Sequence, residues 1–387
     1  MPDSVHVARW VKQLDPNCLE VHLFSSTGTL EIHPELDGVT VHSPFFGWSA
    51  RKVGKVNARL HSLFLLGTNL LLRKTFRDAV HGFRARRLKA VVKRIYPDLI
   101  HSLEMQAAGY LTLDTKKQFE GPFPPWLVTN WGSDIFLFGR LQSHSLKITE
   151  VLANCNYYSC ECERDMKLAQ KFGFNGRMMP VFPNAGGFDL QQVEITRNQI
   201  APSARKLIML KGYQSWAGRA LVGLRALRRC SDIMAGYTVV IYSAPPDVLL
   251  AAELFSLESG IPVRIIPKST PHQEMLSLHA QARISIGLSI SDGVSTSFLE
   301  ALTMGSFPIQ SCTACVSEWI DHGVSGMIVP PEDPDIVEMA IRRGLEDDDL
   351  VDRASQINWR TALERLDSNL LKQKVSLMYS QILLEKD

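Results

Sequence analysis

Short apolar runs alternate along this chain with longer stretches in which apolar residues recur every three or four positions. In the second half the alternation is regular: residues 205–212 (RKLIMLKG) predict a strand and residues 218–230 (GRALVGLRALRRC) predict a helix. The same order then repeats through YTVVIYSA, DVLLAAELFSLESG, VRIIP, PHQEMLSLHAQA, RISIGLSI, STSFLEALTMG, SFPIQS, VSEWIDHG, GMIVPP and PDIVEMAIRRGLED. Strands that alternate with helices predict a parallel sheet covered on both faces.

The first half carries the same alternation. Residues 5–14 (VHVARWVKQL) have helical spacing, and residues 97–102 and 125–134 predict strands. Further strands are predicted at LEVHLFSS, GVTVHSP, NYYSC and RMMPVFPNAGGFD, and helices at EMQAAGYLTLDTKKQF and ERDMKLAQKFG. A doubly wound domain begins with a strand, whereas this sequence begins at the helix that would follow one. Whether a first strand is missing or the sheet edge is built otherwise stays open.

A polar stretch at 187–202 interrupts the alternation and predicts a linker between two domains. We expect an α/β protein with a first Rossmann-like domain at 1–190, a second at 203–360, and a C-terminal helix at 361–387 that packs back on the first. In such a fold ligands bind at the carboxyl ends of the strands, in the cleft between the domains.

Composition narrows the function classes. The 387 residues carry a net charge of +2, which argues against a nucleic-acid binder that works by charge alone. The longest apolar run, at 63–72, is shorter than the roughly 20 residues of a membrane-spanning helix, and no signal peptide is visible. Together with an odd number of cysteines, seven, this predicts a cytoplasmic protein with free thiols. The clusters CNYYSCEC and SCTAC favour buried thiols over a metal site, since zinc sites need more ligands.

The candidate chemistry centres on residues 291–311 (SDGVSTSFLEALTMGSFPIQS), where a glycine turn and a helix start follow the predicted strand RISIGLSI. Free backbone N–H groups and the helix dipole make such a turn a seat for an anion. Asp292 falls in the turn and Glu300 in the second turn of the helix, where a carboxylate can accept sugar hydroxyls. The alternative is a capped helix with a solvated glutamate.

Two acids eight positions apart, followed by Glu318, Gly323, Gly326, Pro330 and Asp333, resemble the C-terminal domain of the retaining glycosyltransferases with the GT-B fold, family four. The resemblance covers most of residues 205–350; in the first half HVARWVKQL, WGSDI and VFPNAGGFD carry it more loosely. The first acid of the family is usually Glu, and here it is Asp.

The resemblance implies a nucleotide-sugar donor. It assigns the nucleotide ribose to Glu300 and the transferred sugar to Asp292, with Lys211 and Arg219 as cations at the diphosphate, at a wider spacing than is usual in the family. The remaining expected donor contacts are Gly293, Val294, Ser295 and Pro267. Because the cations Lys211 and Arg219 stand in place of Mg²⁺, we expect no metal and no cofactor.

The acceptor is expected to be a glycan or a lipid-linked glycan bound by the first domain. The candidates are aromatic, amide and charged side chains near predicted strand ends and the first helix: His6, Arg9, His101, Asn130, Trp131 and Asp134. For each histidine, a core or surface role is the more common alternative.

Residues 73–94 carry nine Lys or Arg and one acid, with apolar residues roughly at helical spacing. This pattern suits an anionic membrane surface, and a helix packed on the sheet is an equal alternative. The resemblance implies a retaining, metal-independent glycosyltransferase of cell-envelope polysaccharide or glycolipid assembly, and the basic segment agrees with a place on the inner face of the cytoplasmic membrane. The alternatives are a GT-B sugar-nucleotide epimerase and an inactive sugar-binding or scaffold subunit.

Overall fold

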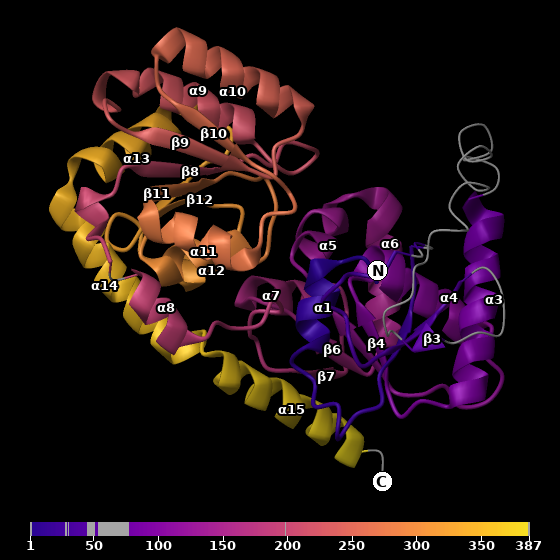
Figure 1. Ribbon diagram of the computed structural model, residues 1–387. Helices are drawn as coiled ribbons and strands as arrows, with labels where there is room; N and C mark the ends of the chain where they lie inside the picture. The colour runs from indigo at the N-terminus through magenta and orange to yellow at the C-terminus, as the bar shows by residue number, and fades with distance from the viewer. Residues whose placement is uncertain are drawn as a thin grey trace. The chain divides into compact units, whose positions relative to one another are not determined.

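The computed structural model describes residues 2–27, 29, 31–44, 51–52, 77–197 and 199–385. The chain divides into two compact units (Figure 1). The first comprises Met1–Glu161, Asp165–Gly186 and Leu371–Asp387, and the second comprises Cys162–Arg164 and Gly187–Leu370. A segment of three residues from the first half of the chain therefore belongs to the second unit. No helix in the described ranges is long and apolar enough to cross a bilayer.

The second unit is built on one six-stranded sheet of order β10-β9-β8-β11-β12-β13, parallel throughout. Helices α9, α10 and α13 cover one face and α11 and α12 the other (Figure 1). The elements are α8 (Leu190–Arg197), η3 (Pro202–Ala204), β8 (Leu207–Lys211), α9 (Ala220–Arg229), η4 (Ser231–Ile233), β9 (Thr238–Tyr242), α10 (Pro246–Ser259), β10 (Val263–Ile266), α11 (His272–Gln281), β11 (Ala282–Gly287), α12 (Thr296–Met304), β12 (Phe307–Ser311), η5 (Cys315–Glu318), β13 (Met327–Val329), α13 (Pro334–Glu346) and α14 (Asp348–Arg365).

The alternation predicted for this half is confirmed, with two corrections. The stretch expected to be a polar linker contains α8, because Leu190 and Val193 are three residues apart and bury one face in the core beside α12. The helix expected after 315 is a single 3-10 turn, η5.

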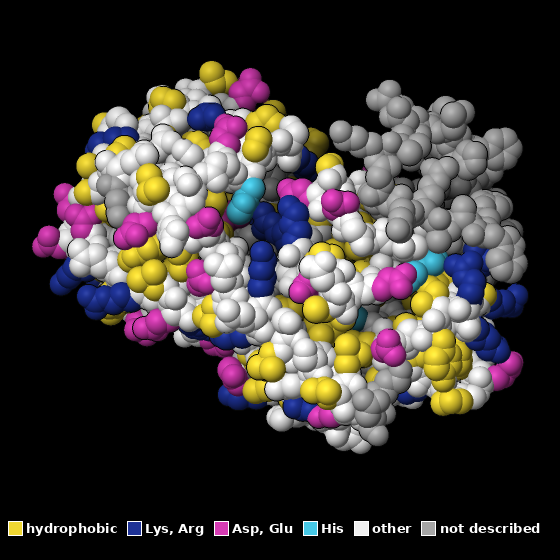
Figure 2. All heavy atoms as spheres, turned by 60° about the horizontal axis from the view of Figure 1, so that its bottom comes forward, with side chains coloured by type: hydrophobic (Ala, Val, Ile, Leu, Met, Phe, Trp, Pro, Cys, Tyr) yellow, Lys and Arg dark blue, Asp and Glu magenta, His cyan; other side chains and the backbone are white. Residues whose placement is uncertain are grey.

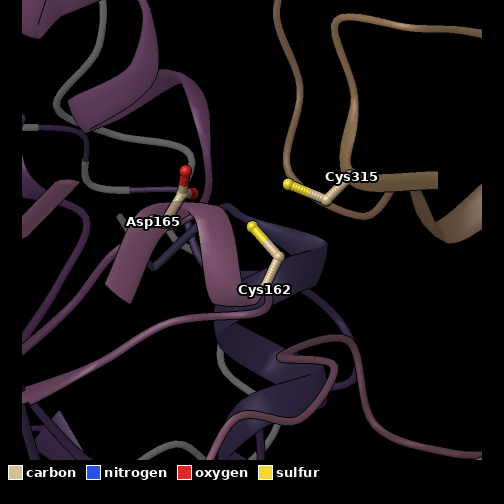
Figure 3. Close-up of side chains that lie close together, drawn as sticks. All are labelled: Cys162, Asp165 and Cys315. Atoms are coloured by element: carbon tan, nitrogen blue, oxygen red, sulfur yellow. The ribbon is translucent and has the colours of Figure 1, made fainter. Parts of the chain in front are cut away.

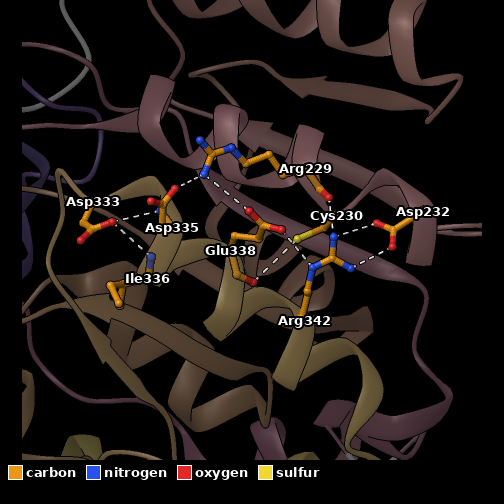
Figure 4. Close-up of polar contacts among 8 residues, drawn as sticks. All are labelled: Arg229, Cys230, Asp232, Asp333, Asp335, Ile336, Glu338 and Arg342. Atoms are coloured by element: carbon orange, nitrogen blue, oxygen red, sulfur yellow. Dashed lines mark hydrogen bonds and ion pairs between the residues drawn. The ribbon is translucent and has the colours of Figure 1, made fainter.

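Polar contacts tie the outer helices of this unit together (Figure 4). Arg342 of α13 donates two bonds to the carboxylate of Asp232, which follows α9, and a third to the carbonyl of Arg229 at 2.6 Å. Arg229 in turn pairs with Asp335. Arg229 and Asp232 are exposed and Arg342 is half-buried, so these ion pairs add little to stability.

The first unit has its strands in two sheets. One has the order β1-β2-β3 and the other, β4-β5-β6-β7, is parallel. No described strand pairs with the second edge of β1 or of β4, and residues of both strands line one cavity of about 190 Å³. The single doubly wound sheet expected for this half is therefore divided in the part of the chain that the structure describes.

Helices fill the remainder of the first unit. The predicted helix at 104–119 is confirmed, but its first turn is a π-helix. The C-terminal helix α15 contributes Leu371, Val375 and Met378 to a core shared with Trp10. The elements are α1 (Val5–Val11), β1 (His22–Phe24), β2 (Thr40–His42), β3 (Arg51–Lys52), α3 (Arg77–Ile95), β4 (Ile100–Leu103), η1 (Met105–Gly109, a π-helix), α4 (Tyr110–Lys117), β5 (Trp126–Thr129), α5 (Ser133–Phe136), η2 (Phe138–Arg140), α6 (Gln142–Asn154), β6 (Tyr157–Ser159), α7 (Glu163–Lys171), β7 (Arg177–Met178) and α15 (Ser368–Leu384).

Candidate functional site

The acid pair of the second unit lies where β11 leads through a turn into α12. The carboxylate of Asp292 accepts the N–H of Gly293 at 3.0 Å, which closes the turn locally. Ser295 is the N-cap residue, but its hydroxyl does not cap the helix. It contacts Ser297 Oγ at 2.8 Å instead, so the first N–H groups of α12 receive no bond from the cap side chain.

Lys211 ends β8 and meets this turn from the neighbouring strand. Its Nζ donates to Ser295 Oγ at 3.1 Å and lies 3.6 Å from Asp292 Oδ2. β8 and β11 are paired in parallel, so their carboxyl ends fall at the same edge of the sheet. The structure therefore brings Lys211, Asp292 and Ser295 together across about eighty residues of sequence.

Arg219, the second expected cation, is bound elsewhere. Its Nε donates to Glu332 Oε1 at 2.9 Å, and its NH1 donates to the carbonyl of Gly218 at 2.9 Å. Its backbone N–H donates to the carbonyl of Leu288, just after β11. The residue is thus anchored beside the loop that holds Asp292, but its guanidinium is engaged with protein acceptors rather than grouped with Lys211.

Glu300 is buried, with 6% of its surface exposed, and lies between two imidazoles of α11. His272 Nε2 is 2.8 Å from Oε1, and His279 Nε2 is 3.8 Å from Oε2. His279 is fully buried, and burial lowers its pKa to about 4, so the ring is neutral near pH 7. At 3.8 Å the His279 contact is too long for a hydrogen bond, and His272 holds the carboxylate directly.

The other expected donor contacts are placed as follows. Val294 is buried, with its side chain in the core, so only its backbone is available to a ligand. The carbonyl of Gly293 accepts the N–H of Cys315 at 2.9 Å. Pro267 is exposed in the loop after β10, where its carbonyl accepts the N–H of Thr270.

Arg164 and Glu318 also contact the loops of this site, and neither was identified as a site residue from the sequence. Arg164 donates through NH2 to the carbonyl of Asp292 and through NH1 to the carbonyl of Thr313, both at 2.9 Å. The carboxylate of Glu318 accepts the N–H groups of Glu163 and Arg164 at 3.0 and 3.3 Å. Arg164 therefore joins the loops that follow β11 and β12. It is more than a hundred residues from either loop, and no local pattern marks it.

Two buried thiols lie close to these contacts (Figure 3). The sulfur atoms of Cys162 and Cys315, both in the second unit, are within 4.8 Å of each other. Asp165, also drawn there, belongs to the first unit, where its carboxylate accepts Asn130 Nδ2 at 2.7 Å. Within the second unit the pair supplies two ligands, whereas structural zinc sites use four. Cys312 is exposed, contrary to the expectation that this cluster is buried.

In the first unit, two of the expected acceptor residues lie together. The rings of His6 on α1 and Trp131 after β5 are 5.3 Å apart, tilted by 59°. His6 is exposed, and Arg9, one turn along α1, is half-buried. An aromatic ring beside an exposed polar helix start is a surface on which a sugar ring can pack.

Of two others, Asn130 is a core residue, against the expectation that it contacts a ligand, and His101 is half-buried with both ring nitrogens in contact with protein hydroxyls. His101 lies between Tyr379 Oη at 2.7 Å and Thr129 Oγ1 at 2.6 Å, and burial lowers its pKa to about 3. Asn130 is fully buried and donates to Asp165. Position near a strand end was the signal for both residues. The contact of His101 with Tyr379 of α15 comes from a distant segment of the chain, which only the tertiary structure places.

Asp134 is also buried, and it belongs to an acid pair that the sequence does not reveal. Its Oδ2 accepts the N–H of Met105 at 3.1 Å. Glu104 immediately precedes Met105. It has φ of 89° and its carboxylate accepts the N–H groups of Gln106 and Ala107 at 2.6 and 2.7 Å. Burial, and then the charge of Glu104, raise the pKa of Asp134 to about 7.

Comparison with known proteins identifies the fold. The structure is similar to a sucrose-phosphate synthase from Thermosynechococcus elongatus (14% identity, TM-score 0.63, covering 81% of this chain and 80% of that chain). It is also similar to a glycosyltransferase from Rickettsia africae (15%, 0.63, 98% and 93%) and to Anabaena HepE in complex with UDP-glucose (15%, 0.60, 77% and 82%). At these identities the similarity concerns the fold.

Family models identify the sequence. The model "Glycosyl transferase 4-like" matches residues 2–161, and "Glycosyl transferases group 1" matches residues 255–359. No curated protein matches the chain in sequence. The two models together span well over half of the 387 residues, and the resemblance noted in the sequence is confirmed. The chain belongs to the glycosyltransferases with the GT-B fold, family four.

Proposed function

We propose that this enzyme transfers a sugar, with retention of anomeric configuration, from a nucleotide-sugar to a glycan or lipid-linked acceptor in cell-envelope polysaccharide or glycolipid assembly. The observation that carries the proposal is the grouping of Lys211, Asp292 and the start of α12 at one sheet edge, with Glu300 one helical turn further on. HepE, which shares the fold, was solved with UDP-glucose, which supports a donor of this class.

Each group of this cluster has a role that follows from its charge. The ammonium of Lys211 and the uncapped N–H groups of α12 stabilise the diphosphate, which gains charge as the bond between the anomeric carbon and the phosphate oxygen breaks. Asp292 accepts hydroxyls of the transferred sugar, and Glu300 accepts those of the ribose. Arg219 can contact the diphosphate only if its hydrogen bond to Glu332 breaks.

The proposed chemistry needs no protein nucleophile. The acceptor hydroxyl attacks the anomeric carbon on the face that the phosphate leaves, and its proton passes to the leaving phosphate oxygen. Because Lys211 supplies positive charge at the diphosphate, we propose that the reaction needs no metal ion. Turnover that is unchanged by a chelator supports this part, and turnover that stops and is restored by Mg²⁺ contradicts it.

The acceptor is proposed to bind the first unit through His6, Arg9 and Trp131, which keep exposed surface. Asp134 is buried and accepts the N–H of Met105, so it has no direct contact in this proposal. An aromatic ring with polar neighbours suits a sugar ring better than an extended peptide. Asn130 has no direct part in this proposal because it is a core residue, and His101 has none because both of its ring nitrogens contact protein hydroxyls.

Peripheral association with an anionic membrane, on the cytoplasmic side, is a separate part of the proposal. Figure 2 shows Lys and Arg side chains gathered at the outer edge of the first unit, where α3 lies. Residues 73–76 of the basic segment lie outside the described residues. The apolar face of α3, including Ala85, Leu88 and Val92, packs against α4, so association would rest on charge. Flotation with anionic but not neutral vesicles is expected, and equal failure with both contradicts it.

A nucleoside diphosphate release assay tests the function. The purified protein is first matched to a donor by thermal shift against UDP-, GDP- and ADP-sugars. Release that requires a glycan acceptor is the expected result. A C2-inverted sugar nucleotide formed without acceptor would identify an epimerase, and donor binding with no turnover would identify a sugar-binding subunit.

A further inference from the structure

Glu300 is held unequally by its two imidazoles. His279 is fully buried and fixed through Nδ1, which lies 3.0 Å from Ser285 Oγ, and that hydroxyl lies 2.7 Å from Ser306 Oγ. His272 is the first residue of α11, and its side chain is 40% exposed. Its ring stacks on Phe188 with centroids 6.4 Å apart. The deep side of the carboxylate is therefore rigid core, and the outer side is an accessible histidine.

The bond to Glu300 defines which atom of His272 is free. A carboxylate oxygen only accepts, so Nε2 carries the proton of the 2.8 Å contact. In the neutral ring Nδ1 is then an acceptor. No described residue forms a hydrogen bond with Nδ1, and the ring is not covered. An acceptor nitrogen and the oxygens of Glu300 thus belong to one hydrogen-bonded pair.

His272 Nδ1 and a Glu300 carboxylate oxygen are two acceptors on one hydrogen-bonded pair, and a vicinal diol offers two donors. Each hydroxyl of a ribose can donate one hydrogen bond, one to a carboxylate oxygen and one to an imidazole nitrogen. A lone carboxylate can also take both hydroxyls, but it then has to turn, and the bond to His272 resists that turn. Glu300 keeps 6% of its surface exposed, and its bonded partner His272 keeps 40% of its side chain exposed.

From this geometry we propose that His272 is a second ribose-reading residue, which orients the Glu300 carboxylate through Nε2 and accepts one ribose hydroxyl at Nδ1. The inference rests on the proposed function, because it assumes that a nucleotide occupies this edge of the sheet. It adds a specificity: the site selects ribonucleoside diphosphates against their deoxy counterparts. A site built to bond a hydroxyl rejects the analogue that lacks it, because its own polar groups are left without a partner.

The test is a set of dissociation constants measured by calorimetry. UDP, ADP, GDP and CDP are titrated into the full chain, and the tightest of them is compared with its 2′-deoxy and 3′-deoxy forms. The wild type is expected to prefer the ribose form over at least one deoxy form by about tenfold or more. His272→Ala is expected to reduce that preference to less than about threefold. His272→Gln, which keeps a donor and an acceptor, is expected to restore part of it and remains informative should the alanine variant not fold.

Matched controls separate specificity from folding. Gln273→Ala changes the next residue of the same helix, which is exposed and has no described partner, and is expected to keep the wild-type preference. The melting temperature without ligand reports any purely structural effect of His272→Ala. A preference that is unchanged in His272→Ala overturns the inference, as does an equal loss of affinity for ribose and deoxy forms. If none of the four nucleotides binds the wild type, the proposed function itself fails.

Discussion

The two units each carry a pair of acids at the carboxyl ends of parallel strands, and the pairs are held by different kinds of partner. In the second unit Glu300 is bonded to His272, and Asp292 lies 3.6 Å from Lys211. In the first unit Glu104 accepts backbone N–H groups of η1, and Asp134 accepts one from Met105. Side-chain partners can rotate away from an acid, whereas backbone partners cannot.

This difference separates a ligand site from a structural element. His272 and Lys211 both keep exposed surface, so a ligand can compete for the acids that they hold. Glu104 is locked in a backbone conformation that residues other than glycine rarely adopt, with φ of 89°. Strain of this kind persists only where the surrounding structure enforces it. We therefore expect changes in the first pair to alter stability and changes in the second pair to alter binding and turnover.

The largest effect is expected for Glu104→Ala. Loss of the carboxylate leaves the N–H groups of Gln106, Ala107 and Ala108 without their acceptor, which should lower the free energy of unfolding by about 2 kcal/mol or more. Urea denaturation measures the change. Glu120→Ala, which removes an exposed acid paired with surface lysines, is the control and should have little effect. Equal stability of the two variants would contradict the structural role of Glu104.

Lys211→Ala is expected to lower turnover by about a hundredfold while the donor dissociation constant changes by less than about tenfold, because charge on the diphosphate develops in the transition state. Steady-state kinetics with the donor identified by thermal shift measures both. Lys206→Ala, an exposed lysine just before β8, is the control. A turnover that matches the control would remove Lys211 from the site.

Glu300→Gln is expected to weaken donor binding by about tenfold, since an amide keeps the shape but accepts hydroxyls less strongly than a carboxylate. The melting temperature should change little compared with the loss of affinity. Glu274→Gln, an exposed acid on α11, is the matched control. Donor affinity equal to that of the wild type would show that the ribose assignment is wrong.

A pH dependence of stability is expected from Asp134. Its pKa is raised to about 7 in the folded state from an ordinary value of 3.8, so between these values the folded protein holds a proton that the unfolded chain has released. Stability from this group is therefore present at low pH and is lost as pH rises from about 4 to about 7. Asp134→Asn should flatten that part of the stability profile, measured by urea titrations at several pH values. An unaltered slope would contradict the assignment.

The order of elements in the second unit follows from local pattern, because the apolar runs and helical periods of 205–346 are regular and each is contained in a few residues. The acid spacing of 291–311 likewise indicated a strand, a turn and a helix start, and the structure has all three. The family resemblance was recognisable from the sequence for the same reason, because its motif lies in one contiguous stretch.

Other features depend on contacts between distant segments. The pairing of Arg219 with Glu332 spans 113 positions, and the bond of Arg164 to the Asp292 carbonyl spans 128. His101 looked accessible at a strand end, but its Nδ1 is bonded to Tyr379 of α15. Nothing within ten residues of any of these positions carries that information, because periodicity reports which face of an element is apolar and not what packs against it.

The sequence by itself determined an α/β chain of glycosyltransferase type with an acid pair at a turn before a helix. Its alternation of apolar runs and its contiguous motif are local properties that require no knowledge of the fold. Only the tertiary structure decided which charged groups share that turn, which of the predicted ligand residues are core, and that two histidines of α11 lie on either side of Glu300. Burial and hydrogen bonding are set by neighbours in space, and most of those neighbours come from elsewhere in the chain.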